Sequence, residues 1–204
     1  MAISTVIFDM GGVIVWTHWE HATEPLGRAA GMAPEQVLET VLNSDTHLAY
    51  MRGEIDTGEF ASSVAASLDI KMPADELMGH WNSILAPNLE ALPLLERVKG
   101  KHRLVLGSNT DEEHYKRSAE LQPALALFAD TLLSYELGHC KPDTAFFTSG
   151  LEVLGVSPDE CVFIDDVAEN IESATSLGIT GIRFESMAQV ELELETLGLF
   201  RGAP

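Results

Sequence analysis

The apolar and polar positions divide the chain into a first strand, a long helical stretch and a region where helices and strands alternate. Thr5 to Phe8 form an apolar, partly β-branched run of the kind found in buried strands. From about Trp16 to Pro87 the pattern is helical, broken by glycines and prolines, with no convincing strand. Helices are expected here at residues 34–48, 57–68 and 74–85.

From Asn88 onward, helical patterns and apolar runs take turns along the chain. Helices are expected at 89–99, 112–121, 144–154, 168–177 and 187–197, and strands at 103–106, 131–134, 161–164 and 181–184. This alternation predicts a parallel sheet with right-handed crossovers. We therefore expect a Rossmann-like α/β core with helices on both faces, formed by residues 1–15 and 88–204. Residues 16–87 would form a separate helical domain inserted after the first strand.

Composition narrows the class of protein. The 204 residues are 46% hydrophobic with a mean hydropathy of +0.08, as expected for a globular chain, and no apolar run approaches the roughly 20 residues of a membrane span. The N-terminus lacks a basic segment followed by a small-residue cleavage site, which argues against a secretory signal. Only two cysteines are present, so reduced thiols and a cytoplasmic location are expected.

The net charge excludes two kinds of partner. With 12 basic and 32 acidic residues the chain carries a formal charge of −20, and nucleic acids and anionic membranes bind basic surfaces instead. A small anionic substrate would need local cations to overcome this charge. The sequence leaves open whether the protein is a monomer or a homodimer.

One carboxylate directly follows the first predicted strand. Asp9 stands at the carboxyl end of the run from Thr5 to Phe8, followed closely by Gly11 and Gly12. Ligands of open α/β sheets bind outside the carboxyl ends of the strands, and glycines there allow a sharp turn and a close backbone approach. Asp9 is therefore expected to be a metal ligand, a nucleophile or both.

Three further polar clusters follow later strands or their loops. Ser108 and Asn109 come after the strand at 103–106, where a hydroxyl and backbone N–H groups near a helix start suit an anion. Lys141 lies in the loop ahead of the helix at 144–154, and Asp165 with Asp166 follows the strand at 161–164. We expect these clusters to meet Asp9 at one edge of the sheet.

Together these motifs give the sequence its resemblance to a known family. In chain order the segments are FDMGGVIV, LGSNT, GHCKPD and FIDDVAENIESA, and MRGEIDTGEF lies in the helical stretch. The sequence resembles the haloacid dehalogenase superfamily hydrolases that carry a helical cap after the first strand. Within that superfamily it looks most like the small sugar-phosphate phosphatases, including α-glucose-1-phosphatase-like proteins. The resemblance covers essentially the whole chain and implies a cap at residues 16–87.

The resemblance implies a chemistry as well as a fold. It suggests a phosphoric monoester hydrolase in which Asp9 attacks a small phosphorylated metabolite, such as a sugar phosphate, and forms an aspartyl-phosphate that water hydrolyses. Mg²⁺ is the implied cofactor. Its implied ligands are the Asp9 carboxylate, the Gly11 carbonyl and Asp166, with Asp165 bound directly or through water.

The resemblance also assigns roles to three other residues. Ser108 would bind the transferring phosphoryl group, and Asn109 would contact substrate or orient its loop. Lys141 would offset the crowding of the three carboxylates and keep them ionised.

The chain departs from the family pattern at Gly11. Many family phosphatases carry an acid two residues after the nucleophile, which protonates the leaving oxygen. Loss of such a group typically costs 10²–10⁴-fold in rate. We expect His18, Glu20 or an ordered water to take its place.

Other functions stay open from the sequence. Asp9, Ser108 and the pair Asp165-Asp166 could merely cap helices or form turns. A 2-haloacid dehalogenase also uses an Asp nucleophile, although the acid pair argues against it. A phosphomutase and a catalytically silent protein that binds a phosphorylated ligand are further alternatives. The sequence does not say which ester would be cleaved.

Overall fold

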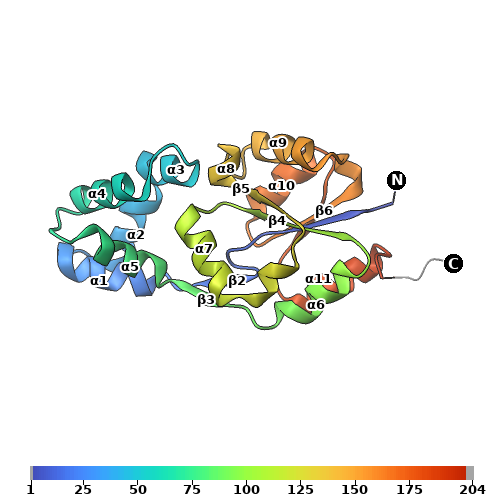
Figure 1. Ribbon diagram of the computed structural model, residues 1–204, viewed down its shortest axis with the longest axis horizontal. Helices are drawn as coiled ribbons and strands as arrows, with labels where there is room; N and C mark the ends of the chain where they lie inside the picture. The colour runs from blue at the N-terminus through green and yellow to red at the C-terminus, as the bar shows by residue number, and fades with distance from the viewer. Residues whose placement is uncertain (1, 201–204) are drawn as a thin grey trace.

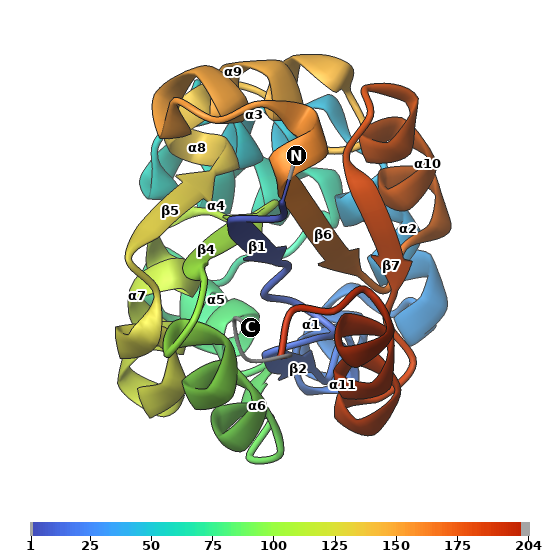
Figure 2. The ribbon, with the colours of Figure 1, turned by 90° about the vertical axis from the view of Figure 1, so that its right-hand side faces the viewer.

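A computed structural model describes residues 2–200 and places a five-stranded sheet at the centre of the fold. Its strand order is β5-β4-β1-β6-β7, and all four neighbouring pairs are parallel (Figure 2). The strands are β1 (Thr5–Phe8), β4 (Arg103–Ser108), β5 (Asp130–Leu133), β6 (Cys161–Asp165) and β7 (Thr180–Arg183). The predicted α/β class with a parallel sheet is confirmed.

Helices cover both faces of this sheet, as the alternating pattern predicts (Figure 2). On one face lie α6 (Ala91–Lys99) and α11 (Met187–Thr196), and on the other lie α9 (Thr144–Leu154) and α10 (Ala168–Ser176). The remaining elements of this region are α7 (Glu112–Leu121), η1 (Pro123–Leu127), the short α8 (Ser134–Leu137) and η2 (Pro158–Glu160).

The central strand β1 shows why its apolar pattern could be recognised in the sequence. Successive side chains of a strand point to opposite faces of a sheet. Val6 and Phe8 therefore join the hydrophobic cluster under α6 and α11, while Ile7 joins the cluster under α9 and α10. Because both faces are covered, β1 is buried at every position and reads as a continuous apolar run.

Five helices between β1 and α6 gather at one end of the molecule (Figure 1). They are α1 (Glu20–Ala30), α2 (Pro34–Leu42), α3 (Asp45–Met51), α4 (Thr57–Ser67) and α5 (Ala74–Asn82). They bury a hydrophobic cluster of their own, which includes Leu26, Phe60, Leu77 and Trp81. This separate cluster supports the division at residues 16 and 87, which stays a prediction.

The single helix expected over residues 34–48 is wrong. The chain leaves α2 at Asn43, and Ser44 adopts an extended conformation in which its hydroxyl accepts a 3.0 Å hydrogen bond from the His47 amide. Serine is a favoured N-cap residue because its oxygen satisfies a free amide of the first turn. The cap at Ser44 therefore starts α3 as a second helix.

The expectation of no strand between Trp16 and Pro87 is also wrong. Two short strands, β2 (Val15–Thr17) and β3 (Leu85–Pro87), pair antiparallel where the chain enters and leaves the five-helix segment. Each has three residues, which is too short for an alternating pattern to be recognised. Because β3 begins at Leu85, the helix expected over 74–85 ends early, at Asn82.

Two buried amide side chains fix the base of this β2–β3 ribbon. Asn88 donates to the carbonyl of Val13 at 2.8 Å, and Gln122 donates to the carbonyls of Ile14 at 2.9 Å and Asn88 at 2.8 Å. Both side chains are 2% exposed. These bonds satisfy buried backbone carbonyls and hold the ribbon against the core.

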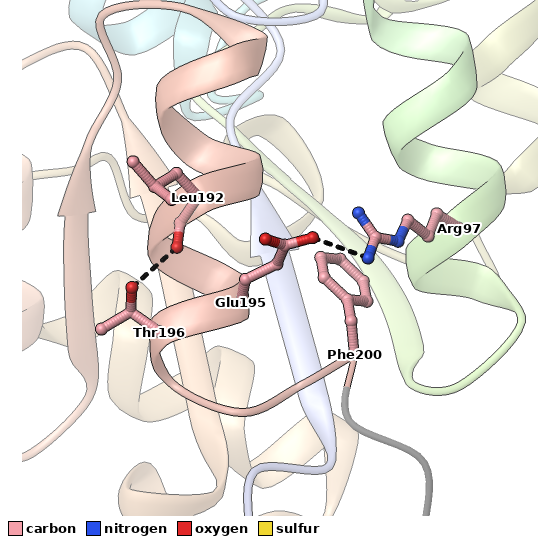
Figure 3. A pocket seen from close by; sticks show the side chains of 5 residues that line it. All are labelled: Arg97, Leu192, Glu195, Thr196 and Phe200. Carbon is pink, nitrogen blue, oxygen red and sulfur yellow. Dashed lines mark hydrogen bonds and ion pairs between the residues drawn. The ribbon is translucent and has the colours of Figure 1, made fainter.

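A surface hollow of about 380 Å³ lies between α6 and α11 (Figure 3), on the side away from the five helices (Figure 1). Arg97 bonds Glu195 at 2.7 Å and also pairs with Glu191, and its guanidinium lies 3.9 Å from the centre of the Phe200 ring. The guanidinium of Arg97 thus links α6 to α11. Among the described helices, none combines the length and apolar character that crossing a bilayer requires.

Candidate active site and metal site

The carboxyl ends of the central strands meet at a small cavity of about 250 Å³. Residues from the loops after β1, β4, α8 and β6 and from α10 reach it, together with Thr17 of β2 and Trp19 at the start of α1. Its lining consists of Asp9, Gly11, Gly12, Thr17, Trp19, Asn109, Lys141, Asp166, Val167 and Asn170. The structure therefore brings together most of the residues that the sequence marked.

Lys141 occupies the centre of the site. Its ammonium nitrogen donates to Asp9 at 2.7 Å, to Asp165 at 2.7 Å and to the carbonyl of Gly107 at 2.9 Å. The lysine side chain is 1% exposed. Burial alone would lower the pKa of Lys141, but the two carboxylates raise it above its ordinary value. Lys141 is thus held as a cation with all three of its donors used.

Asp165 is completely buried and fully bonded. Its Oδ1 accepts from the Val167 amide at 2.8 Å, its Oδ2 accepts from Lys141, and the Asn170 side-chain amide lies 3.0 Å from both oxygens. A carboxylate offers about four acceptor sites, and these contacts use them. The geometry therefore favours a role for Asp165 in orienting its neighbours. It does not favour Asp165 as a direct metal ligand.

Asp9 and Asp166 retain oxygens that face the cavity. Asp9, Asp165 and Asp166 each place a carboxylate oxygen within 4.8 Å of the others. Burial, with the charge of Asp165, raises the pKa of Asp9 to about 7 against the lowering effect of Lys141. Burial and Asp165 also raise the pKa of Asp166. A hard divalent cation binds clustered carboxylate oxygens whose negative charge is not fully balanced by other cations. These residues therefore fit Mg²⁺.

Gly12 allows Asp166 to come close. Its backbone has φ of +76°, a left-handed conformation that glycine adopts readily. A side-chain carbon at this position would collide with the carboxylate of Asp166. The second glycine after Asp9 thus leaves the space that Asp166 occupies.

Asn109 and Ser108 lie in different surroundings. The side-chain amide of Asn109 donates to the carbonyl of Lys141 and accepts from the Lys141 amide, both at 2.8 Å. Of the two roles expected for Asn109, the geometry favours orienting a loop. Ser108 ends β4 with 1% exposure, bonds the Asn109 carbonyl at 3.4 Å and lies outside the described lining of the cavity. Its phosphoryl-binding role stays a prediction.

The residues suggested as substitutes for the missing acid do not reach the cavity lining. His18 and Glu20 face each other instead, with 3.4 Å between Nδ1 and Oε1, and both side chains are substantially exposed. Gly11 itself lines the cavity, and a carbon added to it would have one neighbour within 4 Å, the Cγ2 of Thr17 at 3.9 Å. The position of the missing acid is therefore open space.

Five residues of the described lining are not among the predicted site residues: Gly12, Thr17, Trp19, Val167 and Asn170. Asn170 lies in the first turn of α10, and its spacing of five residues from Asp165 was a usable signal. Thr17 and Trp19 enter the lining because the β2–β3 ribbon carries them over the carboxyl end of the sheet. Their position depends on a ribbon that the sequence did not reveal.

A buried network joins the five-helix segment to the loop behind Asn109. Tyr50 of α3 donates to Asp111 at 3.2 Å, and Asp111 accepts from the His114 amide at 2.9 Å as the N-cap of α7. The His114 ring stacks on Trp81 of α5 with 5.7 Å between ring centres. All four residues are at most 8% exposed. The orientation of the helices is thus tied to the loop that positions Asn109.

Comparison with known proteins gives consistent results. A family model described as haloacid dehalogenase-like hydrolase matches residues 3–178. A phosphatase from Mycobacterium tuberculosis is 30% identical over 97% of this chain and 96% of its own length. A D-ribitol-5-phosphate phosphatase from Bacteroides thetaiotaomicron is 25% identical over 96% of this chain and 98% of its own length. A crystal structure of a haloacid dehalogenase-family enzyme from that organism, in complex with magnesium and inorganic phosphate, is 26% identical and superposes with a TM-score of 0.81. The match covers 93% of this chain and 99% of the other.

Proposed function

We propose that this chain, which belongs to the haloacid dehalogenase-like hydrolase family, is a phosphatase that hydrolyses a small phosphorylated metabolite with the help of Mg²⁺. The observation that carries this proposal is the position of Asp9. Its carboxylate lies at the carboxyl end of β1, bonded to Lys141 and within 4.8 Å of the carboxylates of Asp165 and Asp166. A relative bound to magnesium and phosphate supports the choice of ligands.

In the proposed reaction Asp9 is the nucleophile. One oxygen of its carboxylate attacks phosphorus, the bond to the leaving oxygen breaks, and water later hydrolyses the aspartyl-phosphate. Lys141 holds Asp9 in place and balances part of its charge, because its ammonium lies 2.7 Å from the Asp9 oxygen. Positioning and neutralisation of charge are most of what phosphoryl transfer requires of a protein.

Asp9 and Asp166 would hold the cation, with the Gly11 carbonyl as a further ligand. When bound, Mg²⁺ supplies positive charge for the phosphoryl oxygens. Asp165 orients Lys141 and the loop of Asp166 through its four hydrogen bonds. Asn109 sets the position of Lys141 through its backbone.

The five helices would act as a cap. Thr17 and Trp19 bring the start of this segment into the cavity lining, so its position affects what the site can accept. Such caps exclude water and select substrate, with motions commonly on the μs–ms timescale. The two buried thiols fit the reducing, cytoplasmic setting expected from the sequence.

The test is phosphate release by the purified protein from a panel of sugar phosphates, nucleotides and phosphorylated acids. Release that requires Mg²⁺, stops with EDTA and is lost in Asp9→Asn supports the proposal. Halide release from chloroacetate without added metal would instead identify a dehalogenase. A flat response across the panel, with phosphate binding retained, would identify a silent ligand-binding protein.

A further inference from the structure

The proton donors around the cavity decide which esters the proposed reaction can cleave. When the phosphorus–oxygen bond breaks, its electron pair stays on the leaving oxygen. A strongly basic leaving oxygen needs a proton as it departs, and a positioned acid typically speeds this step by 10²–10⁴-fold. A weakly basic oxygen departs as an anion without such help. The lining residues can therefore be compared as proton donors.

Three ionisable side chains line the cavity, and each has another task. Asp9 is the attacking group. Lys141 already donates to Asp9, Asp165 and the Gly107 carbonyl, and its side chain is 1% exposed. Asp166 belongs to the acid cluster that fits a divalent cation. Along the described lining, no ionisable group is left to face a leaving oxygen.

The other lining side chains are not useful acids. Thr17 offers a hydroxyl, Trp19 an indole N–H and Asn109 an amide that is already bonded to Lys141. The imidazole of His18 and the carboxyl of Glu20 pair with each other outside this lining. No proton donor of the described lining therefore suits the departing oxygen.

The cavity nevertheless has space for such a donor. Gly11 lies two residues after Asp9, its backbone is outside the left-handed region, and a carbon added to it meets only Thr17 Cγ2 at 3.9 Å. A side chain would fit at this position without backbone strain. The cavity thus lacks a proton donor at this position because residue 11 is a glycine, and not because a side chain there would be crowded.

We propose that this site selects phosphates whose leaving oxygen is weakly basic, namely acyl phosphates and the esters of enols, phenols and hemiacetals, over phosphates of ordinary alcohols. This inference rests on the phosphatase activity proposed above. A carboxylate oxygen of Asp9 bonds to phosphorus, the leaving oxygen departs with the electron pair, and solvent water protonates it afterwards. Ordinary alcohols are nearly as weakly acidic as water, whereas a phenol, with a pKa of about 10, is far more acidic.

The first experiment measures kcat/KM for acetyl, p-nitrophenyl, phenyl and 2-hydroxyethyl phosphate with Mg²⁺. We expect phenyl phosphate to fall about 10²-fold below p-nitrophenyl phosphate, and 2-hydroxyethyl phosphate to fall further, as expected when a general acid is missing. Equal kcat/KM values across the series would overturn the inference and leave the phosphatase proposal intact. No phosphate from any of the four, acetyl phosphate included, would overturn both.

The second experiment compares Gly11→Asp with Gly11→Asn, which has nearly the same size but no acidic proton. We expect the ratio of kcat/KM for 2-hydroxyethyl phosphate to that for p-nitrophenyl phosphate to be about 10²-fold higher in the aspartate variant. The ratio is used because either side chain alters a residue of the site. Equal ratios in the two variants would overturn the role assigned to residue 11.

Discussion

The side-chain amide of Asn109 pairs with both backbone polar groups of Lys141, through two hydrogen bonds of 2.8 Å. The pairing resembles a rung of a β-ladder, although one partner is a side chain. It joins the loop after β4 to the loop after α8, which otherwise approach the cavity from different strands. The ammonium of Lys141 is therefore placed by its own backbone as well as by the carboxylates it touches.

Truncation of Asn109 should loosen this lysine. In Asn109→Ala the amide and carbonyl of Lys141 lose their partners, so we expect a loss of about 1–3 kcal/mol in the free energy of unfolding. A shift of Lys141 by about 1 Å should lower kcat about 10²-fold. Asn43→Ala, which truncates an exposed asparagine beyond α2, is the matched control. Urea unfolding and steady-state kinetics measure both effects; full activity in Asn109→Ala would contradict the positioning role.

Removal of the Lys141 charge should destabilise the fold. Lys141→Met leaves Asp9 and Asp165 buried together without a cation, and breaking a buried pair typically costs 3–5 kcal/mol. Because Mg²⁺ would supply positive charge nearby, its addition should raise the Tm of the variant more than that of the parent. Lys99→Met, at an exposed position of α6, should change stability by less than about 0.5 kcal/mol. Thermal melts with and without Mg²⁺ measure these effects, and equal Mg²⁺ shifts would argue against a cation at this cluster.

A methyl group at Gly12 should displace Asp166. Gly12→Ala adds a carbon where the Asp166 carboxylate lies, on a backbone with positive φ, so we expect Mg²⁺ to bind at least about 10-fold more weakly. The readout is the Mg²⁺ dependence of Tm, supported by calorimetric titration. Gly79→Ala is the control, since Gly79 lies in α5 with nothing near its missing side chain. That change should leave Mg²⁺ binding unaltered and stabilise the helix by about 0.5–1 kcal/mol.

Loss of the Tyr50 hydroxyl should weaken the connection between cap and core. In Tyr50→Phe the buried carboxylate of Asp111 loses one donor, which should cost about 1–3 kcal/mol. Amide hydrogen exchange should accelerate in α3 and at the start of α7, on both sides of the lost bond. Tyr135→Phe, at a less buried tyrosine of α8, should cost less. Unchanged exchange in Tyr50→Phe would show that packing alone holds this junction.

His47 should make stability depend on pH. Burial lowers the pKa of His47 below its ordinary value, while its Nδ1 lies 3.2 Å from the Leu42 carbonyl and its ring packs against Trp81. Asp111 opposes this lowering and His114 adds to it. Because the folded pKa is lower than the unfolded value of about 6.5, the contribution is present above pH 6.5 and is lost as pH falls through the folded pKa.

The pH effect is measured against His47→Asn, which cannot take up a proton. As pH falls from about 7.5 to 5.5, the stability of the parent should fall faster than that of the variant, by up to about 1.4 kcal/mol per pH unit. Urea unfolding at several pH values gives the difference. Parallel curves for the two proteins would show that His47 is protonated equally well in both states.

The elements that the sequence predicted well share a physical property. Strands such as β1 and β6 are covered on both faces, so every position is apolar and the run stands out from its neighbours. Helix α9 was predicted at its observed ends because Asp143 caps its start and Gly155 ends it in a left-handed conformation. Local chemistry determines these features, and a single sequence therefore reveals them.

The features that were missed depend on distant parts of the chain. The strands β2 and β3 lie about 70 residues apart and pair with each other, and the buried amides of Asn88 and Gln122 bond backbone carbonyls next to them. The same distance hid Thr17 from the predicted site. His18 and Glu20 do not line the cavity, because closeness to Asp9 in the sequence does not determine the direction in which a side chain points.

The β2–β3 ribbon has a consequence for how this architecture can be altered. Since Val15 and Pro87 are paired, the segment between them leaves the core and returns to it at the same place. Shortening, lengthening or exchanging it would add little loop-closure entropy, which grows only with the logarithm of length. A foreign segment grafted between Thr17 and Leu85 would keep the same two attachment points, and it would have to replace the contacts that Tyr50 and Trp81 make with Asp111 and His114.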